Sequence, residues 1–214
     1  MNYFMSMHEL YRGLATGIGN MSWTEALAVV FAIISVLCAR ANNIWVYPAG
    51  IAGILLSIYI FTGEAYKLYP DAGLNLYYLV MSIYGWYVWT RKDAQQHQTP
   101  VTWCSRKELT TAALIFLVLW VTLYGWLSIY RINNVPLLDS FCSSMACSGM
   151  WLLAKRKIEN WIALLISDAA AIPLFFIKKL ILFCGLNIVY VIIAWLGYLS
   201  WKKIWKEEYF TQSR

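Results

Sequence analysis

Long apolar runs alternate with short polar stretches along this chain, and seven of the runs are long enough to cross a lipid bilayer. Each holds roughly 16 to 22 mostly apolar residues, close to the ~20 that a helix needs to span ~30 Å of hydrocarbon. A segment inside the bilayer must satisfy its own backbone hydrogen bonds, so each run is predicted to be an α-helix. The predicted spans cover residues 23–39, 43–61, 71–90, 109–130, 139–154, 158–177 and 180–201.

The composition also indicates an all-α polytopic membrane protein. Of the 214 residues, 61% are hydrophobic and 13% are charged, and the mean hydropathy is +0.56, unlike an ordinary soluble domain. With seven spans, twelve of the 17 Lys and Arg residues fall on the side of the membrane that holds the C-terminus. The positive-inside rule therefore places the C-terminus in the cytoplasm and the N-terminus outside. Because the basic residues follow this topology, we expect no nucleic-acid partner.

The second half of the chain repeats the first. Residues 73–89 align with residues 185–201 at a constant offset of 112, with six identical positions out of seventeen. Upstream the match continues at an offset of 116, through the pairs Leu37/Leu153, Arg40/Arg156 and Trp45/Trp161. Duplicated helix bundles around a pathway are typical of transporters. The repeat predicts two parallel three-helix bundles joined by a linker helix, the 3+1+3 plan of the SWEET sugar transporters.

This plan divides the chain into six segments. They are an N-terminal interfacial segment (1–22), a first three-helix bundle (23–90), a cytoplasmic loop (91–108), the linker helix (109–130), a second three-helix bundle (139–201) and a cytoplasmic tail (202–214).

Asp168 is the sharpest polar signal inside a predicted span. A carboxylate at mid-membrane is costly and by default marks a substrate pathway or a counter-ion. Its partner in the first bundle, at the offset of 116, is Ala52, and we find no Lys or Arg at mid-depth in any span. Asp168 therefore either contacts a cationic ligand or ion, or serves as a structural carboxyl that is protonated or hydrogen-bonded.

The two repeated spans carry matching polar stripes. Asn75 and Tyr78 share one face of the third span, and Asn187 and Tyr190 share the equivalent face of the seventh. Amide and phenol groups are costly in lipid unless they are paired or face a wet cavity. These four side chains are candidates either for lining a cavity or for bonding between helices.

Glycines and tryptophans extend the same stripes. Gly85 and Gly197 predict close helix packing, and Trp89 and Trp201 are interpreted as members of the aromatic belt at the cytoplasmic interface. Trp161 lies two helical turns from Asp168 on the same face. It is either another belt residue or a stacking platform for a flat ligand.

The fifth span adds a stripe of serines, including Ser144 and Ser148, that ends on Trp151. Small residues let helices approach closely, yet these positions also fit a mid-depth site. The complete mid-depth set is Ser144, Ser148, Trp151, Asp168, Asn187 and Tyr190. Such a set suits a flat, cationic, hydroxylated solute, because aromatic faces attract the cation and the amide, hydroxyl and carboxylate groups bind hydroxyls.

Several other functions find no support in the sequence. Phosphate is usually held by Arg or Lys clamps or by a Gly-rich loop, and neither occurs at mid-depth. The five cysteines are scattered without a CxxC pair and no span contains a histidine, so we expect no metal, no cofactor and no intramembrane enzyme. A pure scaffold would explain the repeat but not Asp168. A proton-coupled symporter remains an alternative, and an uncoupler would abolish its accumulation of substrate.

Several motifs in order resemble one known family. They are N-I-W-V-Y-P-A-G at Asn43–Gly50, L-Y-P-D-A-G-L-N-L-Y-Y at Leu68–Tyr78, M-S-I-Y-G-W-Y-V-W at Met81–Trp89, I-E-N-W at Ile158–Trp161 after Lys155, Asp168 with I-P-L at Ile172–Leu174, and G-Y-x-x-W at Gly197–Trp201. Over residues 40–205 the chain resembles the PnuC family of bacterial vitamin transporters.

The resemblance implies uptake of nicotinamide riboside, a cationic pyridinium nucleoside and NAD precursor, by facilitated diffusion. It also implies trapping of the vitamin by a cytoplasmic kinase, and a homotrimer in the bacterial inner membrane. Two positions depart from the family pattern: Leu164 stands where a second tryptophan is common, and Lys178-Lys179 where Lys-Gly is common. Relatives carry thiamine, riboflavin or deoxynucleosides. Thiamine is also flat and cationic, so the residues leave the choice between it and nicotinamide riboside open.

Overall fold

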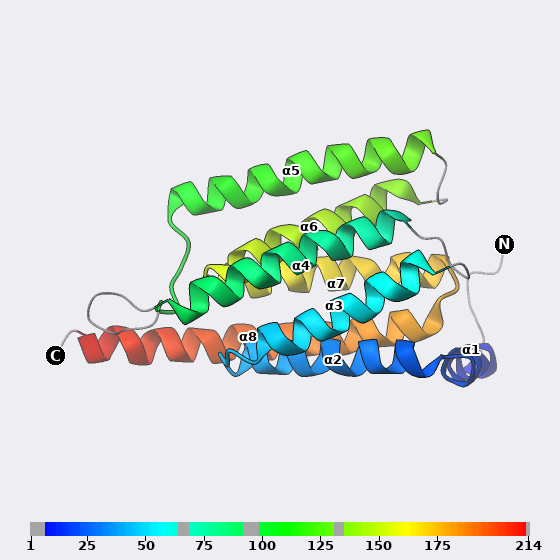
Figure 1. Cartoon of the computed structure of the whole chain (residues 1–214), viewed down its shortest axis with the longest axis horizontal. Coiled ribbons are helices and arrows are strands. Elements are labelled where there is room, and N and C mark those ends of the chain that lie inside the picture. The colour runs from blue at the N-terminus through cyan, green and yellow to red at the C-terminus, as the bar shows by residue number, and fades with distance from the viewer. Residues whose placement is uncertain (1–6, 64–68, 92–98, 131–134, 213–214) are drawn as a thin grey trace.

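The computed structural model describes residues 7–63, 69–91, 99–130 and 135–212, and this part of the chain is almost entirely helical. Its eight helices are α1 (Met7–Gly19), α2 (Trp23–Arg40), α3 (Val46–Thr62), α4 (Tyr69–Thr90), α5 (Arg106–Ile129), α6 (Pro136–Ala154), α7 (Glu159–Ile177) and α8 (Ile181–Gln212). A helix lies at each of the seven predicted spans. The helices α2 to α8 run side by side along one axis, whereas α1 lies across it and is seen end-on in Figure 1.

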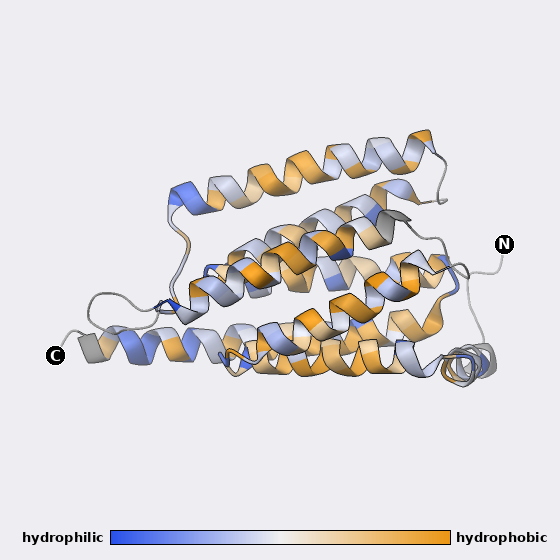
Figure 2. Ribbon diagram, viewed as in Figure 1, coloured by the Kyte–Doolittle hydropathy of each residue, from blue (hydrophilic) through white to orange (hydrophobic). Residues whose placement is uncertain are grey.

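Five of these helices, α2, α5, α6, α7 and α8, are long and apolar enough to cross a membrane by length and composition. The helix α3 is apolar but shorter, with 17 residues. Figure 2 shows hydrophobic residues along the middle of the bundle and hydrophilic residues at the start of α5 and the end of α8. The leucines and valines exposed on α5, among them Leu114, Leu117 and Val118, suit contact with lipid tails. The chain is a multi-pass membrane protein.

Local sequence explains where the helices begin and end. Ser22 and Ser105 each form a capping box with the glutamate three residues on, which satisfies free N–H groups at the starts of α2 and α5. The helix α5 therefore begins at Arg106, before the predicted end of the loop 91–108. The helix α8 continues unbroken through 32 residues to Gln212, so it extends into the predicted cytoplasmic tail, 202–214. Beyond the apolar part, Lys203 and Glu207 pair one turn apart at 3.8 Å and favour this extension.

Two groups of three helices pack against each other. The helix α3 lies between α2 and α4, and α7 lies between α6 and α8. The groups meet where α4 contacts α6 and where α8 contacts α2, while α5 packs on α6. The helix α1 rests on the start of α8, where Gly13 and Gly17 allow the side chains of Ile181 and Leu182 to come close.

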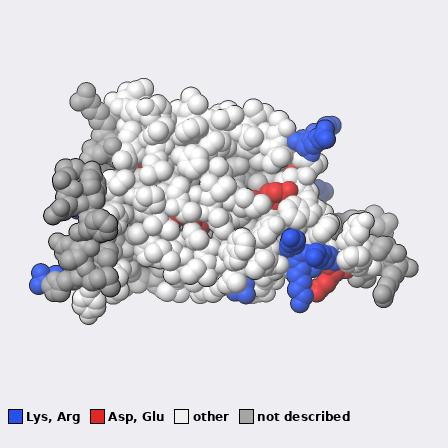
Figure 3. Space-filling model, turned by 180° about the vertical axis from the view of Figure 1, so that it is seen from behind, with Lys and Arg blue, Asp and Glu red and all other residues white. Residues whose placement is uncertain are grey.

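Charged residues separate the two ends of the bundle. Figure 3 shows Lys and Arg side chains gathered mainly at the end where α8 projects, with few on the apolar flank. This end also holds the turn between α2 and α3, the turn between α6 and α7, and the described residues just before α5 (Figure 1). We call it the basic end.

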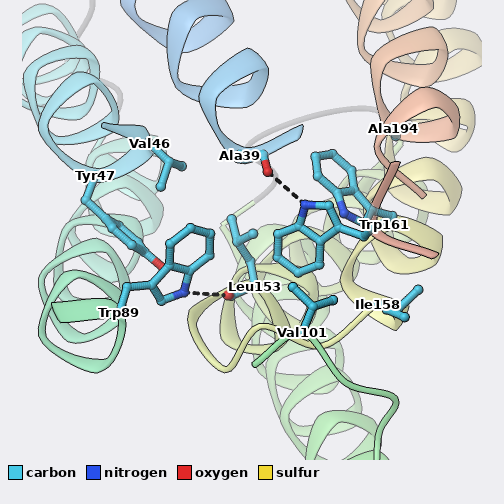
Figure 4. Packing of buried hydrophobic residues seen from close by; sticks show 10 residues of the cluster. Ala39, Val46, Tyr47, Trp89, Val101, Leu153, Ile158, Trp161 and Ala194 are labelled. Carbon is cyan, nitrogen blue, oxygen red and sulfur yellow. Dashed lines mark hydrogen bonds between the residues drawn. The ribbon is translucent and has the colours of Figure 1, made fainter. Parts of the chain in front are cut away.

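The core of the molecule lies just inside the basic end and is rich in aromatic rings (Figure 4). Trp89 of α4 donates from Nε1 to the carbonyl oxygen of Leu153 at 3.3 Å, and Trp201 of α8 donates to that of Ala39 at 2.9 Å. Each indole thus joins one group of three helices to the other. Trp89 and Trp201 are only 1% and 0% exposed, so the prediction that they form an aromatic belt facing lipid headgroups is wrong.

These contacts also correct the alignment of the two halves. Ala39 corresponds to Leu153 as an indole acceptor, and Asn42 and Arg156 have matching positive φ angles of 52° and 54° in equivalent turns. Both pairs are 114 residues apart, not the predicted 116. At this offset the partner of Trp161 is Tyr47, and the rings of both stack edge-on against a tryptophan, Trp201 and Trp89 respectively. Trp45, the predicted partner, is instead 64% exposed.

Candidate functional site

A cavity of about 290 Å³ lies between the two groups of helices. This volume is at the lower end of the ~300–1,000 Å³ range of ligand pockets. Residues from α2, α3, α4, α6, α7 and α8 line it, so both halves of the chain contribute to the wall. Its polar lining residues are Ser35, Tyr47, Ser57, Asn75, Tyr78, Ser82, Trp161, Asp168 and Tyr190.

Among the described residues that line this wall, Asp168 is the acidic one, and none is a Lys or Arg. Within the described part of the chain, the carboxylate of Asp168 forms no hydrogen bond and no salt bridge. Its electrostatic neighbours include the phenols of Tyr78 and Tyr190, one from each half of the chain. A partly buried carboxylate without a cation is costly, so the cavity is suited to a ligand that brings a positive charge.

Two further polar atoms of the cavity wall lack a partner among the described residues. They are Nε1 of Trp161 and the hydroxyl of Tyr47, both buried. Trp161 is 1% exposed, which rules out the belt interpretation and leaves its role as an aromatic wall of the cavity. Since buried donors are normally satisfied, these two atoms could bind polar groups of a ligand.

Glycines bring the walls together. A Cβ atom at Gly197 would lie 2.5 Å from the Trp161 ring, and one at Gly85 would collide with the Tyr47 ring. Both glycines are thus required for the close packing that the sequence predicted. The two close contacts are equivalent in the two halves. In each, an aromatic ring of one helix lies against a glycine of the neighbouring helix.

The structure places Asn75, Tyr78, Trp161, Asp168 and Tyr190 in the cavity wall. The other four predicted site residues, Ser144, Ser148, Trp151 and Asn187, do not line it.

These four side chains have other surroundings. Ser148 donates to the carbonyl of Ala112 at 2.9 Å and so fixes α6 to α5, and Asn187 donates to Phe183 within its own helix at 2.8 Å. Trp151 packs under the ammonium of Lys155 at 4.8 Å. Ser144 is fully buried outside the cavity. Helical periodicity predicted an inner face for Ser144, Ser148 and Trp151, but this face of α6 lies toward neighbouring helices and not toward the cavity.

Tyr47 is the cavity residue that the sequence analysis missed. The alignment at an offset of 116 paired Trp161 with Trp45 and so passed over it. The equivalence of Tyr47 and Trp161 rests on contacts that only the structure shows, because the Tyr47 ring meets Gly85 as the Trp161 ring meets Gly197. Ser35 and Ser57 also line the wall, but their hydroxyls donate to backbone carbonyls of Val46 and Gly53.

Comparison with known proteins identifies a family. Residues 22–203 match the sequence profile of the family described as "Nicotinamide mononucleotide transporter". The chain is 21% identical to the nicotinamide riboside transporter PnuC of Escherichia coli (strain K12), covering 94% of this chain and 93% of that protein. It is also 23% identical to the riboflavin/roseoflavin transporter RibM of Streptomyces davaonensis, with 72% of each chain covered.

A solved structure shares the fold. The crystal structure of the vitamin B3 transporter PnuC superimposes with a TM-score of 0.67, covering 95% of this chain and 94% of that one at 19% identity. The relatives are named as transporters and not as enzymes, in agreement with the function predicted from the sequence.

Proposed function

Because the chain belongs to the nicotinamide mononucleotide transporter family, we propose that it carries nicotinamide riboside across the bacterial inner membrane by facilitated diffusion. The proposal names a flat, hydroxylated cation as the substrate. In the cell, a cytoplasmic kinase would phosphorylate the arriving riboside and so keep it inside. The chain needs no energy source of its own for this.

One observation carries the choice of a cation: Asp168 lines the cavity without a described hydrogen bond or salt bridge. A pyridinium ring would supply the missing charge, and the ring of Trp161 in the same wall offers an attractive face to it. The ribose hydroxyls would find acceptors and donors in Asn75, Tyr78 and Tyr190. Of the mid-depth set predicted from the sequence for a flat, cationic, hydroxylated solute, Asp168 and Tyr190 are among these groups.

The cavity favours the riboside over its phosphate ester. A phosphate group normally needs Arg or Lys donors or a Gly-rich loop. The described residues of the cavity wall supply neither, and Asp168 would repel the ester. We therefore take the riboside named for the Escherichia coli relative as the substrate, and not the mononucleotide of the family description.

The proposed architecture is two parallel three-helix repeats, α2–α4 and α6–α8, with α5 as the linker. The matched indole bonds at the ends of α2 and α6 support it, and so do the matched contacts of α4 with α6 and of α8 with α2. We place the basic end in the cytoplasm by the positive-inside rule, with α1 outside. The homotrimer that the family resemblance implies completes the proposal.

Thiamine is the alternative substrate, since it is flat and cationic as well, and proton-coupled transport is the alternative mechanism. Titration calorimetry of the purified protein with nicotinamide riboside, its mononucleotide and thiamine, side by side, tests the substrate. Binding of the riboside that the mononucleotide does not displace supports the proposal, and binding of thiamine alone reassigns the substrate. Uptake into liposomes tests the mechanism: facilitated diffusion only equilibrates the substrate, whereas a symporter concentrates it until an uncoupler is added.

A further inference from the structure

A second pocket opens at the basic end of the bundle, on the other side of the aromatic core from the cavity. Its volume is about 450 Å³, within the range of ligand pockets. It is lined by Ala41, Asn42, Asn43, Ile44, Trp89, Thr90 and Arg156. None of these residues lines the inner cavity. Trp89 separates the two spaces, since its ring packs on Tyr47 of the cavity wall at 5.2 Å.

Arg156 gives this outer pocket an unusual positive charge. The residue is 4% exposed, and its guanidinium lies 4.2 Å above the centre of the Trp89 ring. It donates to the carbonyl oxygen of Thr99, while its Nε is buried with no partner in the described structure. No salt bridge to a described residue neutralises it. Glu208 interacts with it electrostatically but accepts a hydrogen bond from the backbone of Val101.

Asn42 adds an unused acceptor to the same pocket. Its Oδ1 is buried without a partner among the described residues, and the residue is held in a left-handed conformation with φ of 52°. A ligand that satisfies both orphan atoms must carry an acidic oxygen for Arg156 and a hydroxyl donor for Asn42. Arginine is well suited to phosphate oxygens, because its planar fork of N–H groups matches their geometry.

From this arrangement we infer that the outer pocket binds a hydroxylated phosphate ester, anchored by Arg156. This site is distinct from the proposed transport cavity. It holds a cation, Arg156, without a described salt bridge, whereas the cavity holds an anion, Asp168, without one. An occupant held on Arg156 presses on the guanidinium that covers Trp89. Because Trp89 fixes α4 to the end of α6, the ligand stabilises this contact between the two groups of helices. The same chemistry is present in a soluble nucleotide and in the headgroup of an anionic lipid.

The test uses the purified protein in nanodiscs of neutral phosphatidylcholine, saturated with nicotinamide riboside so that the inner cavity is filled. Nicotinamide mononucleotide is then titrated into wild type, Arg156→Gln and the control Arg91→Gln. Arg91 is an exposed arginine at the same end, above the ring of Tyr87. We expect binding to wild type and the control, and affinity weaker by about tenfold or more in Arg156→Gln. Equal affinity in all three proteins, or no binding to wild type, overturns the inference.

Repeating the titration in nanodiscs with phosphatidylglycerol separates the two sources of phosphate. If phosphatidylglycerol lowers the mononucleotide affinity of wild type but not that of Arg156→Gln, the lipid headgroup is the occupant. If the affinity of wild type is unchanged, the occupant is a soluble ester. If Arg156→Gln does not fold, Asn42→Asp replaces it: aspartate tolerates the left-handed conformation and adds a negative charge, so it should weaken the ester in the same way. The riboside alone is titrated separately, so failure of the proposed transport function is seen independently.

Discussion

Replacing Asp168 by asparagine should change ligand affinity and the stability of the empty protein in opposite directions. Asparagine has nearly the same shape but carries no charge. In the cavity, Asp168 meets no Lys or Arg of the wall, so its charge is available to a cationic ligand. Hydrogen bonds to charged groups contribute ~1.5–3 kcal/mol. Loss of that amount weakens binding of nicotinamide riboside roughly 10- to 150-fold.

The empty protein should respond in the other way. A partly buried carboxylate without a described partner is a cost to the folded state, and asparagine removes the charge while keeping the volume. We therefore expect Asp168→Asn to raise the thermal unfolding temperature of the ligand-free protein. Affinity is measured by titration calorimetry and unfolding by a thermal scan of the same detergent preparation.

The matched control is Asp139→Asn. Asp139 forms a salt bridge with Lys178 at 2.6 Å, close to the opposite end of the bundle. This variant should lose stability, because the lysine loses its partner, and should keep its affinity for the riboside. Unchanged affinity in folded Asp168→Asn would refute the role given to the carboxylate. A lowered unfolding temperature of that variant without ligand would show that Asp168 has a structural partner.

Two further predictions concern packing and reactivity. Gly197→Ala should lower stability by ~1–3 kcal/mol, because the new Cβ meets the Trp161 ring. The control in thermal scans is Gly125→Ala, whose Cβ would have nothing within 4 Å. Equal stability of the two variants would contradict the close packing. Burial and the Glu159 carboxylate raise the pKa of Cys104 to about 12, so little thiolate exists at pH 8 and maleimide labelling should be slow. Glu159→Gln removes part of that shift and should accelerate labelling, as read by mass spectrometry, and an unchanged rate would refute the contact.

Apolar run length was enough to predict the helices α2 to α8. Each predicted span holds one helix, and Ser22 marks the start of α2 where the polar segment ends. The end of α8 was missed because hydropathy stops at the membrane boundary, whereas helix propensity and the packing of Trp205 on Trp103 continue the helix.

The candidate site was predictable in part, for a physical reason. Asp168 and Tyr190 are expensive in lipid wherever they point, so their presence indicated either a cavity or polar bonds between helices. Serines and amides can satisfy themselves on a neighbouring carbonyl, as Ser148 and Asn187 do. Their position on a helix face therefore did not decide whether they line the cavity. The contacts of each side chain with neighbouring helices decide whether it lines the cavity. These contacts depend on how the two halves align, and a shift of two residues changes that alignment.

The two halves of the chain are most alike where they hold the bundle together and least alike where they would meet a ligand. At the basic end, the paired indole bonds and the paired glycine contacts are equivalent in both halves. Within the cavity, the offset of 114 pairs Asp168 with Ile54 and Trp161 with Tyr47, and all four line the wall. A pathway between two bundles needs matching halves so that both can move against each other. A site for an asymmetric cation needs its charge on one side. The carboxylate of Asp168 places the charge on one side of the cavity and leaves the matched contacts between the two halves undisturbed.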